Sequence, residues 1–257
     1  MMRSERTRFS ICASVLIASA LAWTLLLASP VTMQHCAMAV HTPQDSIKMW
    51  LAMNSVTSLL AGWALMVAAM MLPKLILPVR YIYDRSLRRR RFSSILLFLL
   101  GYMGVWTAAG VVINAVVVLG DFLMPHPGAL ALCGGLVVIV WQFSPLKQAC
   151  LNRGHAHPAL AAFGPAAARD ALAFGVVHGC WCVGAGWALM LFPLLLPEGH
   201  LVAMIVVTVI MTSEHLERPR SPRWRISFSH KLLLIIVAQL KIRLSGSFAL
   251  TGLRRPG

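Results

Sequence analysis

Long apolar runs, each about the length of a membrane-spanning helix, constrain this chain more than any other feature. Hydrophobic residues make up 58% of its 257 residues and charged residues only 12%, against roughly 25% charged residues in an ordinary soluble domain. A helix needs about 20 mostly apolar residues to cross a bilayer. Barrel strands are excluded because they alternate polar and apolar residues. We therefore predict an all-α, polytopic helical membrane protein.

Six of these runs define the predicted spans, which we group into one helical domain over residues 1–225. A doubtful seventh span lies in the basic C-terminal tail, 226–257, where the apolar stretch is too short to cross a bilayer. The first run could be a cleaved signal peptide, but it is longer than the usual 7–15 apolar residues, so we favour an uncleaved anchor. The predicted spans are 10–29, 50–73, 94–119, 129–146, 172–196 and 200–213.

Basic clusters set the expected orientation of these spans. The net charge is +15, and Lys and Arg gather after the second, fourth and sixth runs, in 85–91, 147–153 and 218–225. Basic loops stay on the cytoplasmic side, so the N-terminus is expected in the cytoplasm. The charges sit at span ends, which favours anionic lipid as their partner. We therefore expect contact with the lipid bilayer and no nucleic-acid partner.

The stretch HGCWCVGAGWALM, from His178 to Met190, lies inside the fifth predicted span. His178 and Cys182 are one helical turn apart and share a face, whereas Cys180 points about 160° away from Cys182. An ionisable side chain inside a span is costly and usually faces a partner or cavity. Imidazole, thiolate and the thioether of Met190 suit a soft metal, with copper(I) first and zinc second. The competing interpretation is that these cysteine and methionine side chains only pack.

Further soft donors lie near the ends of other spans. Met66 and Met70 are four residues apart in WALMVAAMMLP, and Cys150 follows the fourth span. We predict these three as auxiliary metal donors. The donor-rich outer stretch at 33–41 could gather metal, but no fixed spacing in it defines a site. Lys147 is expected to extend its side chain to the membrane surface. Glu214 is expected to form a surface pair worth little energy.

Three motifs in this order resemble the predicted metal-binding integral membrane proteins of unknown function: WALMVAAMMLP, WQFSPLKQACLNRGHAHP and HGCWCVGAGWALM. The resemblance covers about residues 50–225. It implies a multi-pass protein of the bacterial inner membrane that handles metal, and some members of the family are linked to copper delivery to copper-dependent enzymes. The motif positions that match are Met66, Met70, Met71, Pro73, Gln142, Pro145, Lys147, Cys150, Gly179, Cys182, Gly184, Trp187 and Met190.

This chain departs from the family pattern at two positions. The resemblance leads us to expect cysteine where Gly154 and Gly186 stand, so two thiols are missing. No enzyme signature is present, and we predict a protein that binds or delivers copper rather than an enzyme. The alternatives are a membrane subunit without metal that packs through Gly and Met faces, and a small-solute transporter.

Overall fold

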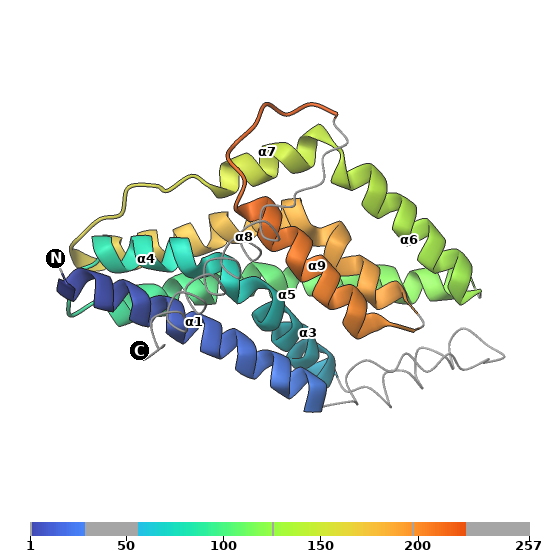
Figure 1. The fold of residues 1–257 in the computed structure, drawn as a ribbon, viewed down its shortest axis with the longest axis horizontal. Helices are drawn as coiled ribbons and strands as arrows, with labels where there is room; N and C mark the ends of the chain where they lie inside the picture. The colour runs from blue at the N-terminus through green and yellow to red at the C-terminus, as the bar shows by residue number, and fades with distance from the viewer. Residues whose placement is uncertain (1, 29–55, 125, 197, 225–257) are drawn as a thin grey trace, which may run out of the picture.

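The structure is a computed structural model that describes residues 2–28, 56–124, 126–196 and 198–224. In these ranges every regular element is a helix and there is no strand, which confirms the all-α prediction. The elements are α1 (Met2–Ala28), α3 (Val56–Met71), the 3₁₀ helix η2 (Leu72–Leu75), α4 (Ile76–Arg85), α5 (Arg91–Leu123), α6 (Pro127–Gln142), α7 (Pro145–Gly154), α8 (Gly164–Leu195) and α9 (His200–His215) (Figure 1).

Four stretches in the described ranges are long and apolar enough to cross a membrane: 9–28, 60–85, 91–120 and 164–195. A fifth is obtained if the bent pair α6 and α7 forms one span, and α9 has only 16 residues. The predicted count of six spans and the cytoplasmic N-terminus stay predictions. The doubtful seventh span and the donor-rich stretch at 33–41 lie outside the described residues.

The second predicted span continues past Pro73, where we expected it to bend or end. The chain tightens into η2 and then resumes as α4 as far as Arg85. A proline has no N–H to donate to the carbonyl four residues earlier, which here belongs to Ala69. The hydroxyl of Ser19 on α1 donates to that carbonyl at 2.8 Å. The break is therefore held by a side chain from another helix.

The fourth predicted span ends earlier than expected, because α6 stops at Gln142 and the chain turns by 64° into α7. Ser144, the residue before Pro145, is extended (φ −72°, ψ 144°), as the ring of a following proline requires. Its side chain accepts a hydrogen bond from the backbone N–H of Lys147 at 3.1 Å, which caps α7. Residues 145–154 are thus a separate helix at an angle to α6.

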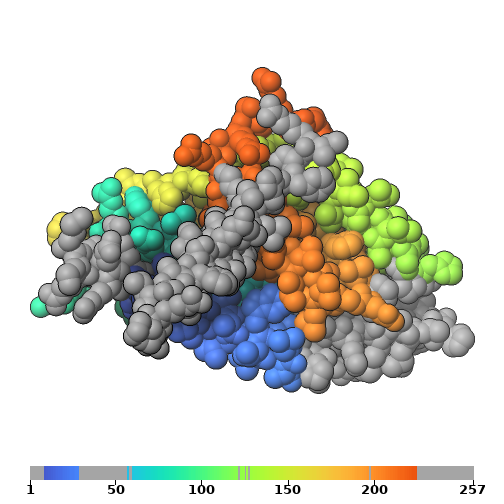
Figure 2. Space-filling view, in the orientation of Figure 1, coloured from blue at the N-terminus to red at the C-terminus, as the bar shows by residue number. Residues whose placement is uncertain are grey.

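Helix α8 is the central element, because α5, α6, α7 and α9 all pack against it, while α1 lies along α3 and η2 (Figure 1). The axes of α5 and α8 come very close at Gly175, where a Cβ atom would stand 2.1 Å from the carbonyl oxygen of Phe98. In the space-filling view, α1 and α9 lie on the face toward the viewer (Figure 2). Side chains on the shared face of α5 and α8 are consequently held inside the bundle.

Candidate metal site

His178 lies inside the bundle, between α8 and α5, rather than toward lipid. Its side chain is buried, and the residue keeps only 5% of its surface exposed. The rings of Phe98, Tyr102 and Phe174 surround the imidazole, each with its centroid 5.9 Å away. The imidazole is therefore enclosed mainly by aromatic side chains of α5 and α8.

Cys182 lies one turn beyond His178 on α8. The side chain of Tyr102 lies beside both residues. The hydroxyl of Tyr102 is 3.2 Å from the Sγ atom of Cys182, and Tyr102 has no exposed surface. Cys180, by contrast, is exposed, as its position on the opposite side of α8 predicts. The helix α5 therefore contributes a polar group to the donor pair, which the α8 motif alone did not indicate.

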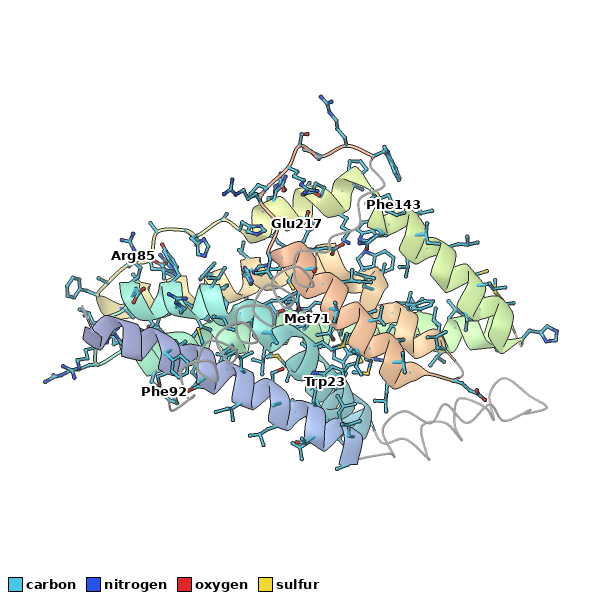
Figure 3. All side chains as sticks on the ribbon, viewed as in Figure 1. Trp23, Met71, Arg85, Phe92, Phe143 and Glu217 are labelled. Atoms are coloured by element: carbon cyan, nitrogen blue, oxygen red, sulfur yellow. The ribbon has the colours of Figure 1, made fainter. Side chains whose placement is uncertain are left out.

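The predicted thioether donors are spread through the hydrophobic core of the bundle. Met190 is twelve residues beyond His178, about 18 Å along the axis of α8, so the two cannot hold the same ion. Figure 3 shows Met71, the neighbour of Met70, near the centre of the bundle. Six methionines from α3, α8 and α9 belong to one hydrophobic cluster and are at most 3% exposed: Met66, Met70, Met71, Met190, Met204 and Met211.

Met211 contacts α8 at Gly186. A Cβ atom added to Gly186 would lie 2.1 Å from the terminal methyl of Met211 and 3.7 Å from its sulfur. Gly186 is one turn beyond Cys182 on the same face of α8. Met211, on α9, was not among the predicted donors because nothing in its local sequence distinguishes it from other membrane methionines.

Cys150 packs against the other flank of α8. Its Sγ atom lies 2.7 Å from the point where a Cβ atom of residue 184 would stand. Gly184 is two residues from Cys182, which corresponds to about 160° around the helix. The structure therefore separates Cys150 from the pair formed by His178 and Cys182.

A buried ion pair, rather than two surface charges, occupies the junction of α6, α7 and α9. The Lys147 ammonium donates to Glu214 at 2.6 Å and to Gln142 at 2.5 Å, and the amide of Gln142 also donates to Glu214. Only 2% of the Lys147 side chain and 12% of the Glu214 side chain are exposed. The expectations of a membrane-surface lysine and a weak surface pair were wrong. The bend between α6 and α7 turns Lys147 inward, toward α9.

Further basic and imidazole side chains lie near the ion pair of Lys147 and Glu214 and near His178. Lys74, on η2, is 7% exposed and is an electrostatic neighbour of Lys147, His178 and His215. The rings of His155 and His215 stack with centroids 5.2 Å apart. The structure thus collects cationic and imidazole side chains around one end of the donor pair.

Both glycines at the positions of expected cysteines border the donor pair. The backbone of Gly154 lies within hydrogen-bonding reach of His178, and Gly186 follows Cys182 by one turn. Within the described ranges, no three His, Cys, Asp or Glu side chains are close enough to hold one metal ion. His178 and Cys182 are therefore two candidate donors, and the part of the chain that the structure describes supplies no third His, Cys, Asp or Glu side chain close enough to join them.

A family model named PpoB2, described as a copper chaperone, matches residues 60–238. No curated protein and no solved structure matches the chain. The matched range contains all six predicted donors, together with Tyr102, the ion pair of Lys147 and Glu214, and Lys74. The donor pair and the polar groups that hold it therefore fall within the shared region.

Proposed function

Because the chain belongs to the PpoB2 family of copper chaperones, we propose that it binds copper(I) within the bundle and delivers it to a copper-dependent apoenzyme. His178 and Cys182 are the proposed ligands. Copper is the cargo of this protein, and the role is one of binding and transfer rather than catalysis. Zinc is the less favoured cargo, because thioether donors suit copper(I) better.

The observation that supports this proposal best is the group formed by the buried side chains of His178 and Tyr102 and the half-buried Cys182. A thiol and an imidazole one turn apart can reach one ion, and the Tyr102 hydroxyl at 3.2 Å holds the sulfur in place. Outer-shell hydrogen bonds of this kind orient metal ligands and commonly change metal affinity by about 10–100-fold.

Met211 is the proposed third ligand, since its thioether adjoins Gly186 one turn beyond Cys182. We propose that the other buried methionines, which include Met66, Met70 and Met190, bind copper(I) weakly, one after another, as it leaves the donor pair. Thioether sulfur is a soft, neutral ligand, and a series of weak sites allows an ion to move on. Cys150 is proposed as an auxiliary donor on the other flank of α8.

The proposed setting is the bacterial inner membrane, with six spans and a cytoplasmic N-terminus. The described ranges contain four helices of suitable length and composition, and a fifth if α6 and α7 form one span. Exposed arginines gather at the ends of α4, α5 and α9, which is the side expected to face the cytoplasm. The lipid bilayer and an apoenzyme are the proposed partners.

Metal analysis of detergent-purified protein tests this proposal. Wild type, His178→Ala and Cys182→Ser are loaded with copper(I) under anaerobic conditions, desalted and analysed for copper and zinc. We expect wild type to retain copper and both variants to lose it. Thermal unfolding provides a second readout, because a ligand of the native state stabilises it. Equal copper content in all three proteins would contradict the proposal.

A second candidate is a membrane subunit without metal, and the close packing of α5 on α8 favours it. A Cβ atom on Gly101 would lie 2.6 Å from the carbonyl oxygen of Leu172, a spacing typical of helices that associate through small residues. In that case Cys182→Ser changes neither metal content nor partner activity, whereas Gly175→Leu disrupts the fold. The same metal analysis therefore separates the two candidates.

A further inference from the structure

A cavity lies beside the bend between α6 and α7, at the end of the bundle where α9 also stops. Its walls come from that bend, from α7, and from residues 214–223 at and beyond the end of α9. Phe143 and Glu217, which both line it, lie at the same end of the molecule (Figure 3). Its volume is about 50 Å³, several times the roughly 10–15 Å³ that one water molecule requires. A compact group of a few heavy atoms, such as a phosphate, is therefore of suitable size.

The wall formed by the chain after α9 is fixed to α7. The side-chain amide of Asn152 donates to the backbone carbonyl of Arg220 at 2.5 Å, and its carbonyl oxygen accepts from the Arg220 backbone N–H at 3.1 Å. The amide of Gln148 donates to the same Asn152 oxygen at 2.9 Å. Residues 218–224 form no helix, so these hydrogen bonds set the position of this segment over the cavity.

Positive charge exceeds negative charge in the lining of this cavity. Four cationic side chains and two carboxylates line it: Lys147, Arg218, Arg220, Arg223, Glu214 and Glu217. Both carboxylates are engaged, one by Lys147 at 2.6 Å and the other by Arg220 at 3.1 Å. Within the described ranges, no ion pair involves Arg218 or Arg223, and both residues are exposed. These two guanidinium groups are therefore available to an anion.

The depth of the cavity suits the phosphate of a lipid headgroup. The apolar helices α6 and α9 end at Gln142 and His215, and the cavity lies where they end. In a bilayer, the polar headgroups border the hydrocarbon core at this depth. Guanidinium groups bind phosphate oxygens through paired N–H donors, and basic pockets between membrane helices are typical sites for anionic headgroups.

Exposed apolar side chains adjoin the cavity lining in the sequence. Leu146 lies between the lining residues Ser144 and Lys147, Val140 is one turn before Ser144, and Trp224 follows Arg223. More than half of the surface of Leu146, Val140 and Trp224 is exposed, and tryptophan is enriched where membranes meet water. Acyl chains would cover this surface, whereas a soluble phosphate compound would not, which favours a lipid as the ligand.

We propose that the cavity between α7 and the chain after α9 binds the phosphate group of one anionic phospholipid. Arg218 and Arg223 are the phosphate contacts, and the acyl chains lie along the exposed apolar side chains of α6. The site differs from the general attraction of basic loops to anionic lipid, because it holds one molecule in a defined place. It does not depend on copper, so it goes beyond the proposed function.

Thermal unfolding of the detergent-purified protein is the first test. The protein is titrated with dioleoylphosphatidylglycerol, which is anionic, or with dioleoylphosphatidylcholine, which has no net charge. We expect only the anionic lipid to raise the unfolding temperature, in a saturable way, as a native-state ligand does. The double variant Arg218→Gln with Arg223→Gln should fold, because both side chains are exposed. Its half-saturation should require at least about tenfold more lipid.

The matched control removes the same charge from another basic loop. Arg88 and Arg89 are exposed in the turn between α4 and α5, and the double variant Arg88→Gln with Arg89→Gln should respond to phosphatidylglycerol like wild type. Equal weakening in the two double variants would mean that the lipid is attracted by overall charge, and the proposed site would be wrong.

Asn152→Ala tests the fixed wall without changing the charge of the protein. It removes both hydrogen bonds to the backbone of Arg220, so the arginine segment loses its attachment to α7. We expect severalfold weaker binding of phosphatidylglycerol, measured as the shift that the lipid produces rather than as the unfolding temperature without lipid. An unchanged lipid response would contradict a site built on this wall.

The source of the phosphate is tested with glycerol 3-phosphate, which has the phosphate but no acyl chains. We expect no protection at the concentration where phosphatidylglycerol saturates, and native mass spectrometry should show one retained phosphatidylglycerol per chain. If glycerol 3-phosphate protects as well as the lipid does, a soluble phosphate compound is the ligand and the phospholipid is wrong.

The copper proposal and the lipid site fail separately. The double variant of Arg218 and Arg223 should retain copper(I) like wild type, because it leaves His178 and Cys182 unchanged. If Cys182→Ser keeps its copper while the lipid results hold, the copper proposal fails and the lipid site stands.

Discussion

Two regions of α8 carry similar soft side chains but hold them in different surroundings. The middle of the helix places His178 and Cys182 beside Tyr102 of α5, whose hydroxyl is 3.2 Å from the Cys182 sulfur. Nearer its C-terminal end, Met190 packs in an apolar cluster with the methionines of α3 and α9. Sulfur content alone therefore does not distinguish a candidate metal site from a packed core. The polar partner supplied by α5 is what the two regions do not share.

The largest effect of a single substitution is expected at the buried ion pair of Lys147 and Glu214. Lys147→Ala leaves Glu214 buried without its partner, so we expect a loss of about 3–5 kcal/mol in the free energy of unfolding. The double variant Lys147→Met with Glu214→Leu should recover most of this stability, because it removes both charges. Denaturant titration in detergent measures both. A loss below about 1 kcal/mol, typical of exposed pairs, would contradict the buried pair.

The next largest effect is expected from the thiol of Cys182, in contrast to the thiol of Cys180 on the opposite face of α8. Cys182→Ser should weaken copper(I) binding by at least about a hundredfold, or about 2.7 kcal/mol, because hydroxyl oxygen is a poor ligand for a soft cation. Cys180→Ser is the matched control on the exposed face and should leave the affinity unchanged. Chelator competition gives both values. Equal losses in the two variants would mean that the thiols act without regard to burial.

A smaller effect is expected from the hydroxyl that links α5 to the donor pair. Tyr102→Phe removes one hydrogen bond worth about 1 kcal/mol, so copper(I) affinity should fall about fivefold. Tyr81→Phe is the control, since the Tyr81 hydroxyl donates instead to the carbonyl of Pro158, in the loop before α8. The same competition assay applies. An unchanged affinity in Tyr102→Phe would mean that this contact contributes to packing but not to copper binding.

Substitution of a buried methionine in the core cluster is expected to have the smallest effect. Met70→Leu keeps the volume of a fully buried side chain, so we expect a cost below about 1.5 kcal/mol and no change in equilibrium copper affinity. Met211→Leu, next to Gly186, should instead weaken copper binding. Thermal unfolding and chelator competition are measured for both. If Met70→Leu weakened copper binding as much as Cys182→Ser, the buried methionines and the donor pair would not differ as proposed.

The sequence was sufficient for those parts of the fold and site that depend on local pattern. Apolar run length predicts the helices, and the four-residue spacing of His178 and Cys182 predicts their shared face. Tyr102 and Met211 were not predictable, because they reach the pair from α5 and α9 through the packing of distant segments. The burial of Lys147 and Glu214 was also missed, since it depends on the 64° bend between α6 and α7.

The hydrogen bond from Ser19 to Ala69 gives the N-terminal helix a role in a site to which it contributes no donor. Proline at position 73 leaves one carbonyl of α3 without its usual partner, and α1 provides a substitute. The next residue along the chain is Lys74. A change as small as Ser19→Ala would thus leave this carbonyl without a partner at the break that carries Lys74, although the hydroxyl lies fifty residues upstream of Ala69.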